Sequence, residues 1–108
     1  MSLVKSMRRL FSGSGKAAAL YERGLEKARL HNWAGAVEDY SAAIRDPKVS
    51  RDVLAMARFN RALAFAHADD QQRAGEDLRA VIAMPDAPAN IRKAAKEKLS
   101  RWGKRSWK

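Results

Sequence analysis

Few residues in this chain have the chemistry that catalysis or metal binding requires. The 108 residues include two histidines, His31 and His67, and no cysteine. Neither histidine has a second histidine or a carboxylate at the spacing of a metal-binding motif. The lack of cysteine also excludes a disulfide framework and a thiolate metal site. The sequence therefore predicts no metal site, no cofactor and no small-molecule substrate.

Adjacent carboxylates occur three times, as Glu38-Asp39, Asp69-Asp70 and Glu76-Asp77. The pair at 69–70 is typical of a turn, because it separates two helical patterns. The other two pairs occupy matching positions of an internal repeat, and we interpret them as solvated helix faces. Catalysis needs reactive groups that are held together in a pocket. Because no such grouping is indicated, we expect no catalytic residues and no enzyme activity.

The segment 12–16, SGSGK, contains a glycine followed by lysine, as a phosphate-binding loop does. Such a loop needs a further glycine five residues before Gly15, where Leu10 stands. It also needs serine or threonine after Lys16, where Ala17 stands. We therefore interpret the segment as a flexible linker.

The chain is organised around an internal repeat, in which the pattern of residues 23–47 recurs over residues 61–85. Placing the first segment over the second gives nine identities: Arg23/Arg61, Leu25/Leu63, Ala28/Ala66, Ala36/Ala74, Glu38/Glu76, Asp39/Asp77, Ala42/Ala80, Ile44/Ile82 and Pro47/Pro85. A fixed period of this size is typical of stacked helical repeats.

Composition predicts an all-α fold. Good helix formers dominate, and the apolar residues do not alternate as they would in strands. No apolar run approaches the roughly 20 residues of a membrane helix. Start and stop signals predict five helices, over residues 17–30, 33–45, 51–68, 71–83 and 89–102, with Gly103 ending the last.

We expect three parts: a basic amphipathic segment with its linker (1–16), a repeat domain (17–101) and a basic tail (102–108). Apolar residues in 1–11 fall on one helix face. Three interpretations of this segment compete. It is an interfacial helix on an anionic membrane, an organelle presequence, or a segment that docks on protein or has no stable structure.

The net charge of +10 is concentrated at the ends of the chain. Residues 1–16 carry four basic and no acidic side chains, 17–88 carry ten and eleven, and 89–108 carry eight and one. Such ends attract nucleic acid, anionic lipid or acidic protein, or they only keep mobile termini in solution. The predicted anion-binding residues are Lys5, Arg8, Arg9, Lys104, Arg105, Trp107 and Lys108.

These features resemble the tetratricopeptide repeat (TPR) family over about residues 17–100. The family pattern falls on Leu20, Gly24, Trp33, Ala36, Tyr40, Ala43 and Pro47, and then on Ala62, Ala74, Leu78, Val81 and Pro85. The step from Arg23 to Arg61 is longer than the usual period of about 34 residues. Arg58 and Gln71 also stand where large apolar residues are usual.

The resemblance implies a right-handed stack of antiparallel helix pairs, a TPR-like α-solenoid with a C-terminal capping helix. The first helix of each repeat would line a concave groove. The residues expected there are Tyr21, Leu25, Arg29, Met56, Phe59, Asn60, Leu63, His67, Lys98 and Arg101. Tyr21 and Phe59 are either anchors for a partner or pack on each other between repeats.

The function predicted from the sequence is a non-catalytic protein-interaction module that binds a peptide or helix of a partner protein. Two repeats and one helix make a small core. Self-association would stabilise such a core, so a homodimer is one arrangement that the sequence suggests. The alternative function is binding of RNA or an anionic membrane through the basic ends. We expect a cytoplasmic protein, or one directed to an organelle or a membrane surface by residues 1–11.

Overall fold

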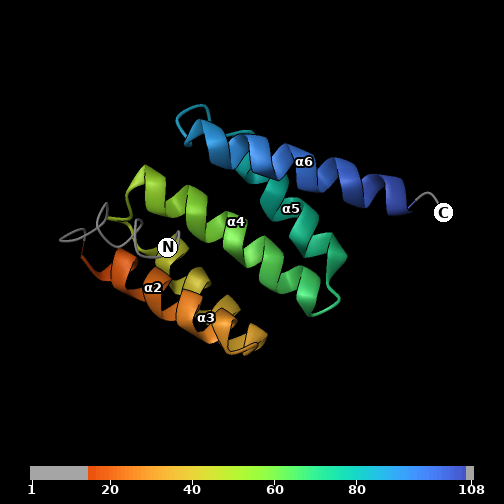
Figure 1. Ribbon diagram of the computed structural model, residues 1–108. Helices are drawn as coiled ribbons and strands as arrows, with labels where there is room; N and C mark the ends of the chain where they lie inside the picture. The colour runs from red at the N-terminus through yellow and green to blue at the C-terminus, as the bar shows by residue number, and fades with distance from the viewer. Residues whose placement is uncertain (1–14, 107–108) are drawn as a thin grey trace.

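The computed structural model describes residues 15–106, with side chains to Gly103, and contains five helices and no strand in that range. The helices are α2 (Lys16–Arg29), α3 (Trp33–Arg45), α4 (Arg51–His67), α5 (Gln71–Ile82) and α6 (Ala89–Ser106) (Figure 1). The predicted all-α class is confirmed. None of the described helices is both long and apolar enough to cross a membrane.

Four of the five helices begin and end within one residue of the predicted positions, but the predicted end of α6 is wrong. Its helix continues through Gly103 to Ser106. A glycine inside a helix costs only about 1 kcal/mol relative to alanine. No heavy atom lies within 4 Å of the position that a Cβ atom would occupy at Gly103. Residues 102–106 therefore continue the helix.

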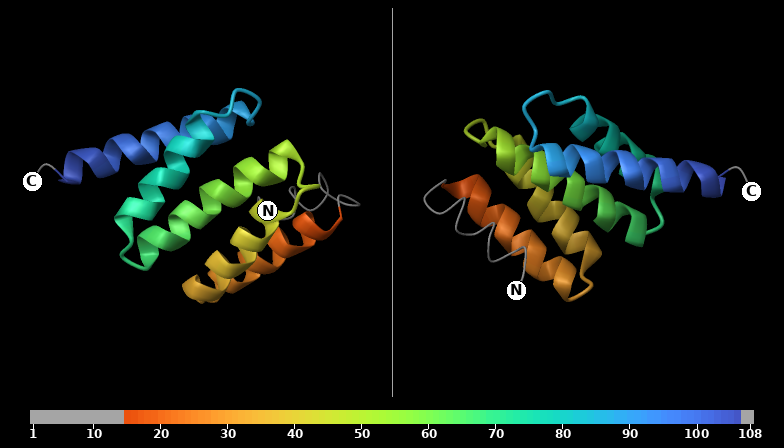
Figure 2. Two further views of the ribbon diagram at one scale, coloured as in Figure 1. Left: turned by 180° about the vertical axis from the view of Figure 1, so that it is seen from behind. Right: turned by 45° about the horizontal axis from the view of Figure 1, so that its top comes forward.

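Helix α4 lies at the centre of the molecule. It contacts each of the other four described helices. Each helix from α2 to α6 also packs against the next helix in the chain. Figure 2 shows α2 and α3 on one side of α4, and α6 crossing it on the other. The C-terminal end of α6 projects beyond the remaining helices in every view (Figures 1 and 2).

The turns within the two helix pairs have the same geometry at equivalent positions of the repeat. His31 and Asp69 both adopt left-handed backbone conformations, with φ of 62° and 63°, a region in which His and Asp are enriched. The next residues, Asn32 and Asp70, each accept a hydrogen bond from the backbone N–H three residues on. These side-chain caps satisfy a free donor at the start of α3 and of α5.

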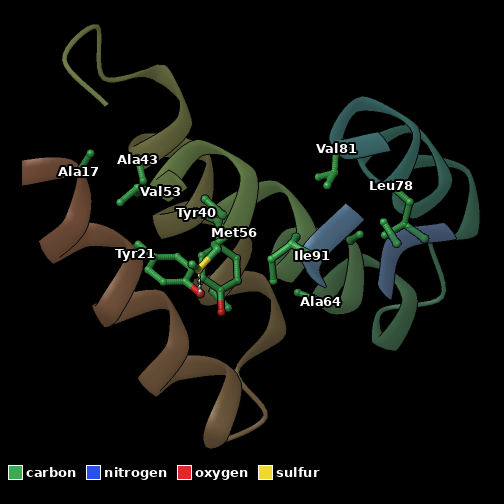
Figure 3. Packing of buried hydrophobic residues seen from close by; sticks show 14 of the residues in the cluster. Ala17, Tyr21, Tyr40, Ala43, Val53, Met56, Ala64, Leu78, Val81 and Ile91 are labelled. Carbon is green, nitrogen blue, oxygen red and sulfur yellow. Dashed lines mark hydrogen bonds between the residues drawn. The ribbon is translucent and has the colours of Figure 1, made fainter. Parts of the chain in front are cut away.

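One apolar cluster extends from α2 to α6. Its largest fully buried side chains are Tyr21, Tyr40, Leu78, Val53 and Val81. Figure 3 shows the two tyrosine rings side by side between the first two helix pairs, next to Met56. The cluster also includes Ile91 and Ala95 of α6, so the last helix is held by the same core as the first.

In each helix pair, one bidentate ion pair joins the two helices. The two ion pairs occupy equivalent positions of the repeat. Arg23 donates to Asp39 at 2.8 and 2.9 Å, and Arg61 donates to Asp77 at 2.7 and 2.8 Å. The hydrogen bond from Arg23 lowers the pKa of Asp39. Both carboxylates are buried, with exposed fractions of 3% and 6%. The expectation of solvated helix faces is therefore confirmed for the exposed Glu38 and Glu76 and wrong for the two aspartates. Pairing with arginine compensates for the burial of the aspartates.

Candidate functional site

A pocket of about 260 Å³ lies where the C-terminal end of α4 meets α5 and α6. We call it the α4–α6 pocket, and its lining residues are Leu63, Ala66, His67, Gln71, Lys98 and Trp102. Leu63, Ala66 and Trp102 provide apolar and aromatic walls. Gln71 and Lys98 add an amide and an ammonium group. The pocket can therefore hold an apolar group that has a hydrogen-bond acceptor or a negative charge beside it.

The imidazole of His67 is held in place by the first helix pair. It stacks on Trp33, with ring centroids 4.2 Å apart and an interplanar angle of 6°. His31 stacks on Trp33 as well, at 5.2 Å and 18°. The left-handed turn at His31 brings its ring to the start of α3. One wall of the α4–α6 pocket is thus braced by a cluster of three stacked rings.

The structure brings together three of the residues that the sequence predicted for a partner site: Leu63, His67 and Lys98. Leu25 and Phe59 are only partly exposed and pack against the core. Neither residue lines the α4–α6 pocket.

Three further predicted residues are engaged elsewhere or face another hollow. Asn60 donates to the hydroxyl of Tyr21 and to the backbone oxygen of Met56. Arg29 is exposed and pairs with Glu26. Arg101 lines a different hollow on the surface of α6.

Tyr21 and Met56 are not surface residues, which corrects their assignment to the groove. Their exposed fractions are 0% and 6%. The hydroxyl of Tyr21 donates to the sulfur of Met56 at 3.9 Å (Figure 3). It also accepts a hydrogen bond from the side-chain amide of Asn60 at 3.0 Å. Its ring contacts Tyr40, with centroids 5.8 Å apart. The tyrosine therefore joins α2 to α4 and α3, and no face remains for a partner.

Sequence reasoning missed Ala66, Gln71 and Trp102 as pocket residues. Trp102 lies near the end of α6 and packs against the core. Gln71 occupies the repeat position equivalent to Trp33, where a large apolar residue is usual. That replacement was the available signal, because a polar residue at an apolar repeat position needs a separate explanation.

The described residues include no group of three or more histidine, cysteine, aspartate or glutamate side chains that could hold a metal ion. Both histidines instead stack on the indole of Trp33.

Most of the predicted anion-binding residues lie beyond what the structure describes. Lys5, Arg8, Arg9, Trp107 and Lys108 are outside the described residues. Lys104 and Arg105 lie within α6, but their side chains are not described. The anion-binding prediction for these seven residues therefore stays a prediction.

Comparison with known proteins gives no relative: no protein-family model, no curated protein and no solved structure matches this chain.

Proposed function

We propose that this chain is a non-catalytic interaction module that binds a peptide or helix of a partner protein at the α4–α6 pocket. The observation that carries the proposal is the meeting of Leu63, His67 and Lys98 around one pocket. Apolar and aromatic anchors supply most of the energy of protein interfaces. A volume of about 260 Å³ is below the roughly 300–1,000 Å³ of drug-sized ligand sites, so we expect one anchoring side chain.

The arrangement of the helices supports a TPR-like stack as the framework of this module. Helix α4 contacts α2 and α6 directly, as expected if the first helices of successive repeats line one face. The turns and ion pairs at equivalent repeat positions support two copies of one structural unit. We propose that the face formed by α2, α4 and α6 is the binding face.

Selection of peptides from a displayed random library would test this proposal with the purified full chain. We expect the selected peptides to share one apolar or aromatic residue beside a carboxylate, which would pair with Lys98. Leu63→Ala and Lys98→Gln should each weaken binding of a selected peptide by about tenfold or more, equivalent to about 1.4 kcal/mol. Binding would be measured by fluorescence anisotropy.

A matched control comes from a second hollow, which is lined by Leu20 and other residues of α2, α3 and the turn after α3. Leu20 and Leu63 are both partly exposed leucines, so Leu20→Ala removes the same atoms elsewhere. Circular dichroism would show that each variant folds. Equal loss of binding in Leu20→Ala and Leu63→Ala would contradict the proposed site, as would selection of no peptide at all.

A further inference from the structure

Residues 89–103 of α6 carry five basic side chains and one carboxylate, Glu97, which is a larger excess of positive charge than any other described helix has. Six basic side chains in α2, α4 and α5 form ion pairs with carboxylates of the chain: Arg23, Lys27, Arg29, Arg51, Arg61 and Arg73. In contrast, none of the described basic side chains of α6 forms an ion pair with a described carboxylate.

Part of this charge forms an exposed line along α6. Lys93, Lys96 and Arg101 are exposed, as are Glu97 and Ser100 between them. Each member lies three or four residues from at least one other member, so the five residues share one side of the helix. We call these five residues the α6 stripe. It spans about 12 Å at 1.5 Å per residue.

A hollow of about 340 Å³ lies on this stripe. It is lined by Lys96, Glu97, Ser100 and Arg101, which offer two cationic groups and one hydroxyl. These donors suit the oxygens of a phosphate group. The carboxylate of Glu97 opposes an anion in the same hollow, so its removal should strengthen anion binding.

The chemistry of the stripe distinguishes between three classes of anionic partner. An interfacial helix on a membrane needs an exposed apolar face, but Ile91, Ala95 and Leu99 pack into the core. Protein interfaces need apolar or aromatic anchors and are depleted in lysine, and the stripe contains only charged and hydroxyl residues. Nucleic acid needs neither feature, because release of counterions from its phosphates supplies the binding energy.

We infer that the α6 stripe binds the phosphate backbone of nucleic acid, without reading base sequence. This activity is separate from the proposed peptide site, because the two share no lining residue. It narrows the anion binding that the sequence predicted for the basic C-terminal end to five residues on the described part of α6.

The test is fluorescence anisotropy of a labelled mixed-sequence DNA duplex with the full chain, from about 50 to 200 mM salt. Replacing Lys93, Lys96 and Arg101 together by glutamine should raise Kd at least about tenfold at the lowest salt. The slope of log affinity against log salt is negative, and each lost phosphate contact should make it shallower by about 0.9. Glu97→Gln should lower Kd under the same conditions.

The matched control replaces Arg45, Lys48 and Arg79 by glutamine, which removes the same charge from exposed positions on other parts of the surface. We expect this variant to keep most of the affinity and salt slope. If both triple variants lose affinity equally, general net charge and not the α6 stripe causes the attraction, and the inference is wrong. No change in Kd in Glu97→Gln would also count against it.

Two further probes distinguish the class of partner. Polyglutamate of matched charge and vesicles that contain anionic lipid would compete with the labelled duplex. We expect neither to compete as well as unlabelled DNA at equal charge. Equal or better competition by polyglutamate or by the vesicles would overturn the assignment to nucleic acid.

Discussion

Two buried tyrosines that contact each other have different hydrogen bonding. The hydroxyl of Tyr21 has both a donor and an acceptor partner, on Asn60 and Met56. The hydroxyl of Tyr40 is buried and has no hydrogen-bond partner among the described residues. Burial raises the pKa of both groups, so each remains a neutral hydroxyl in the folded protein.

We predict that Tyr21→Phe and Tyr40→Phe have different effects on stability. Tyr21→Phe should lower the free energy of unfolding by about 1–2 kcal/mol, because it leaves the amide of Asn60 without one partner. Tyr40→Phe should be neutral or stabilising, because it removes an unsatisfied buried oxygen. Urea unfolding followed by circular dichroism measures both. A loss in Tyr40→Phe as large as that in Tyr21→Phe would show that this hydroxyl is also bonded.

Gly24 and Gly75 are both buried helical glycines, and they should respond to alanine in opposite ways. A Cβ atom at Gly24 would lie 2.6 Å from Cε1 of Tyr40, a buried ring that cannot move away. Gly24→Ala should therefore destabilise the protein by about 1–3 kcal/mol. A Cβ atom at Gly75 would meet the guanidinium of Arg79 at 3.3 Å, and that exposed group can shift.

Gly75→Ala should then stabilise the protein by about 0.5–1 kcal/mol, the ordinary gain in helix propensity. Thermal unfolding of the two variants gives the comparison. If both substitutions stabilise the protein, the close approach of α2 to Tyr40 is not present in solution.

At the scale of the helices, the two equivalent ion pairs should contribute unequally. The side chain of Arg61 is 22% exposed, whereas that of Arg23 is 62% exposed. Water screens the more exposed pair, and Asp39 has a second partner in Lys27. We predict that a double-mutant cycle gives about 1–3 kcal/mol of coupling for Arg61–Asp77 and a smaller value for Arg23–Asp39.

The cycles would use alanine at each position and urea unfolding as the measurement. Equal coupling energies would mean that exposure of the arginine does not decide the strength of these pairs. Arg61 also donates to the hydroxyl of Ser41 in α3. A Ser41→Ala variant would therefore serve as the control that separates this contact from the ion pair.

The helices themselves were largely predictable from the sequence, because capping residues and Asp-Pro or Pro-rich breaks mark their ends. Gly103 misled the prediction, since a glycine ends a helix only where the backbone turns left-handed after it. The lining of the α4–α6 pocket was predicted in part. Leu63 and His67 were placed by their repeat positions, but the burial of Tyr21 depends on how closely α4 approaches α2, which the repeat register does not specify.

At the scale of the whole molecule, α4 makes the two helix pairs and α6 into one structure. It contacts all four other described helices. One apolar cluster includes residues of every described helix. Stacked repeats can unfold independently when the contacts between neighbours are weak. Here the buried Tyr21, Asn60 and Met56 contacts join the first pair to α4, so the interface between units is part of the core.

We predict that the first helix pair and the last helix unfold together. Trp33 lies at the start of α3 and Trp102 lies near the end of α6, so their indoles report on different helices. Two variants, each keeping one of these residues and carrying phenylalanine at the other two tryptophan positions, should show the same urea midpoint by fluorescence. Circular dichroism on each variant is the control, because coincident transitions by different probes indicate two-state unfolding.

The contrary outcome is a fluorescence midpoint at lower urea for Trp102 than for Trp33, with a circular dichroism change at both midpoints. That result would mean that α6 detaches before the helix pairs unfold. In that case the α4–α6 pocket would form only while the last helix is docked, and ligand binding there would stabilise α6 alone.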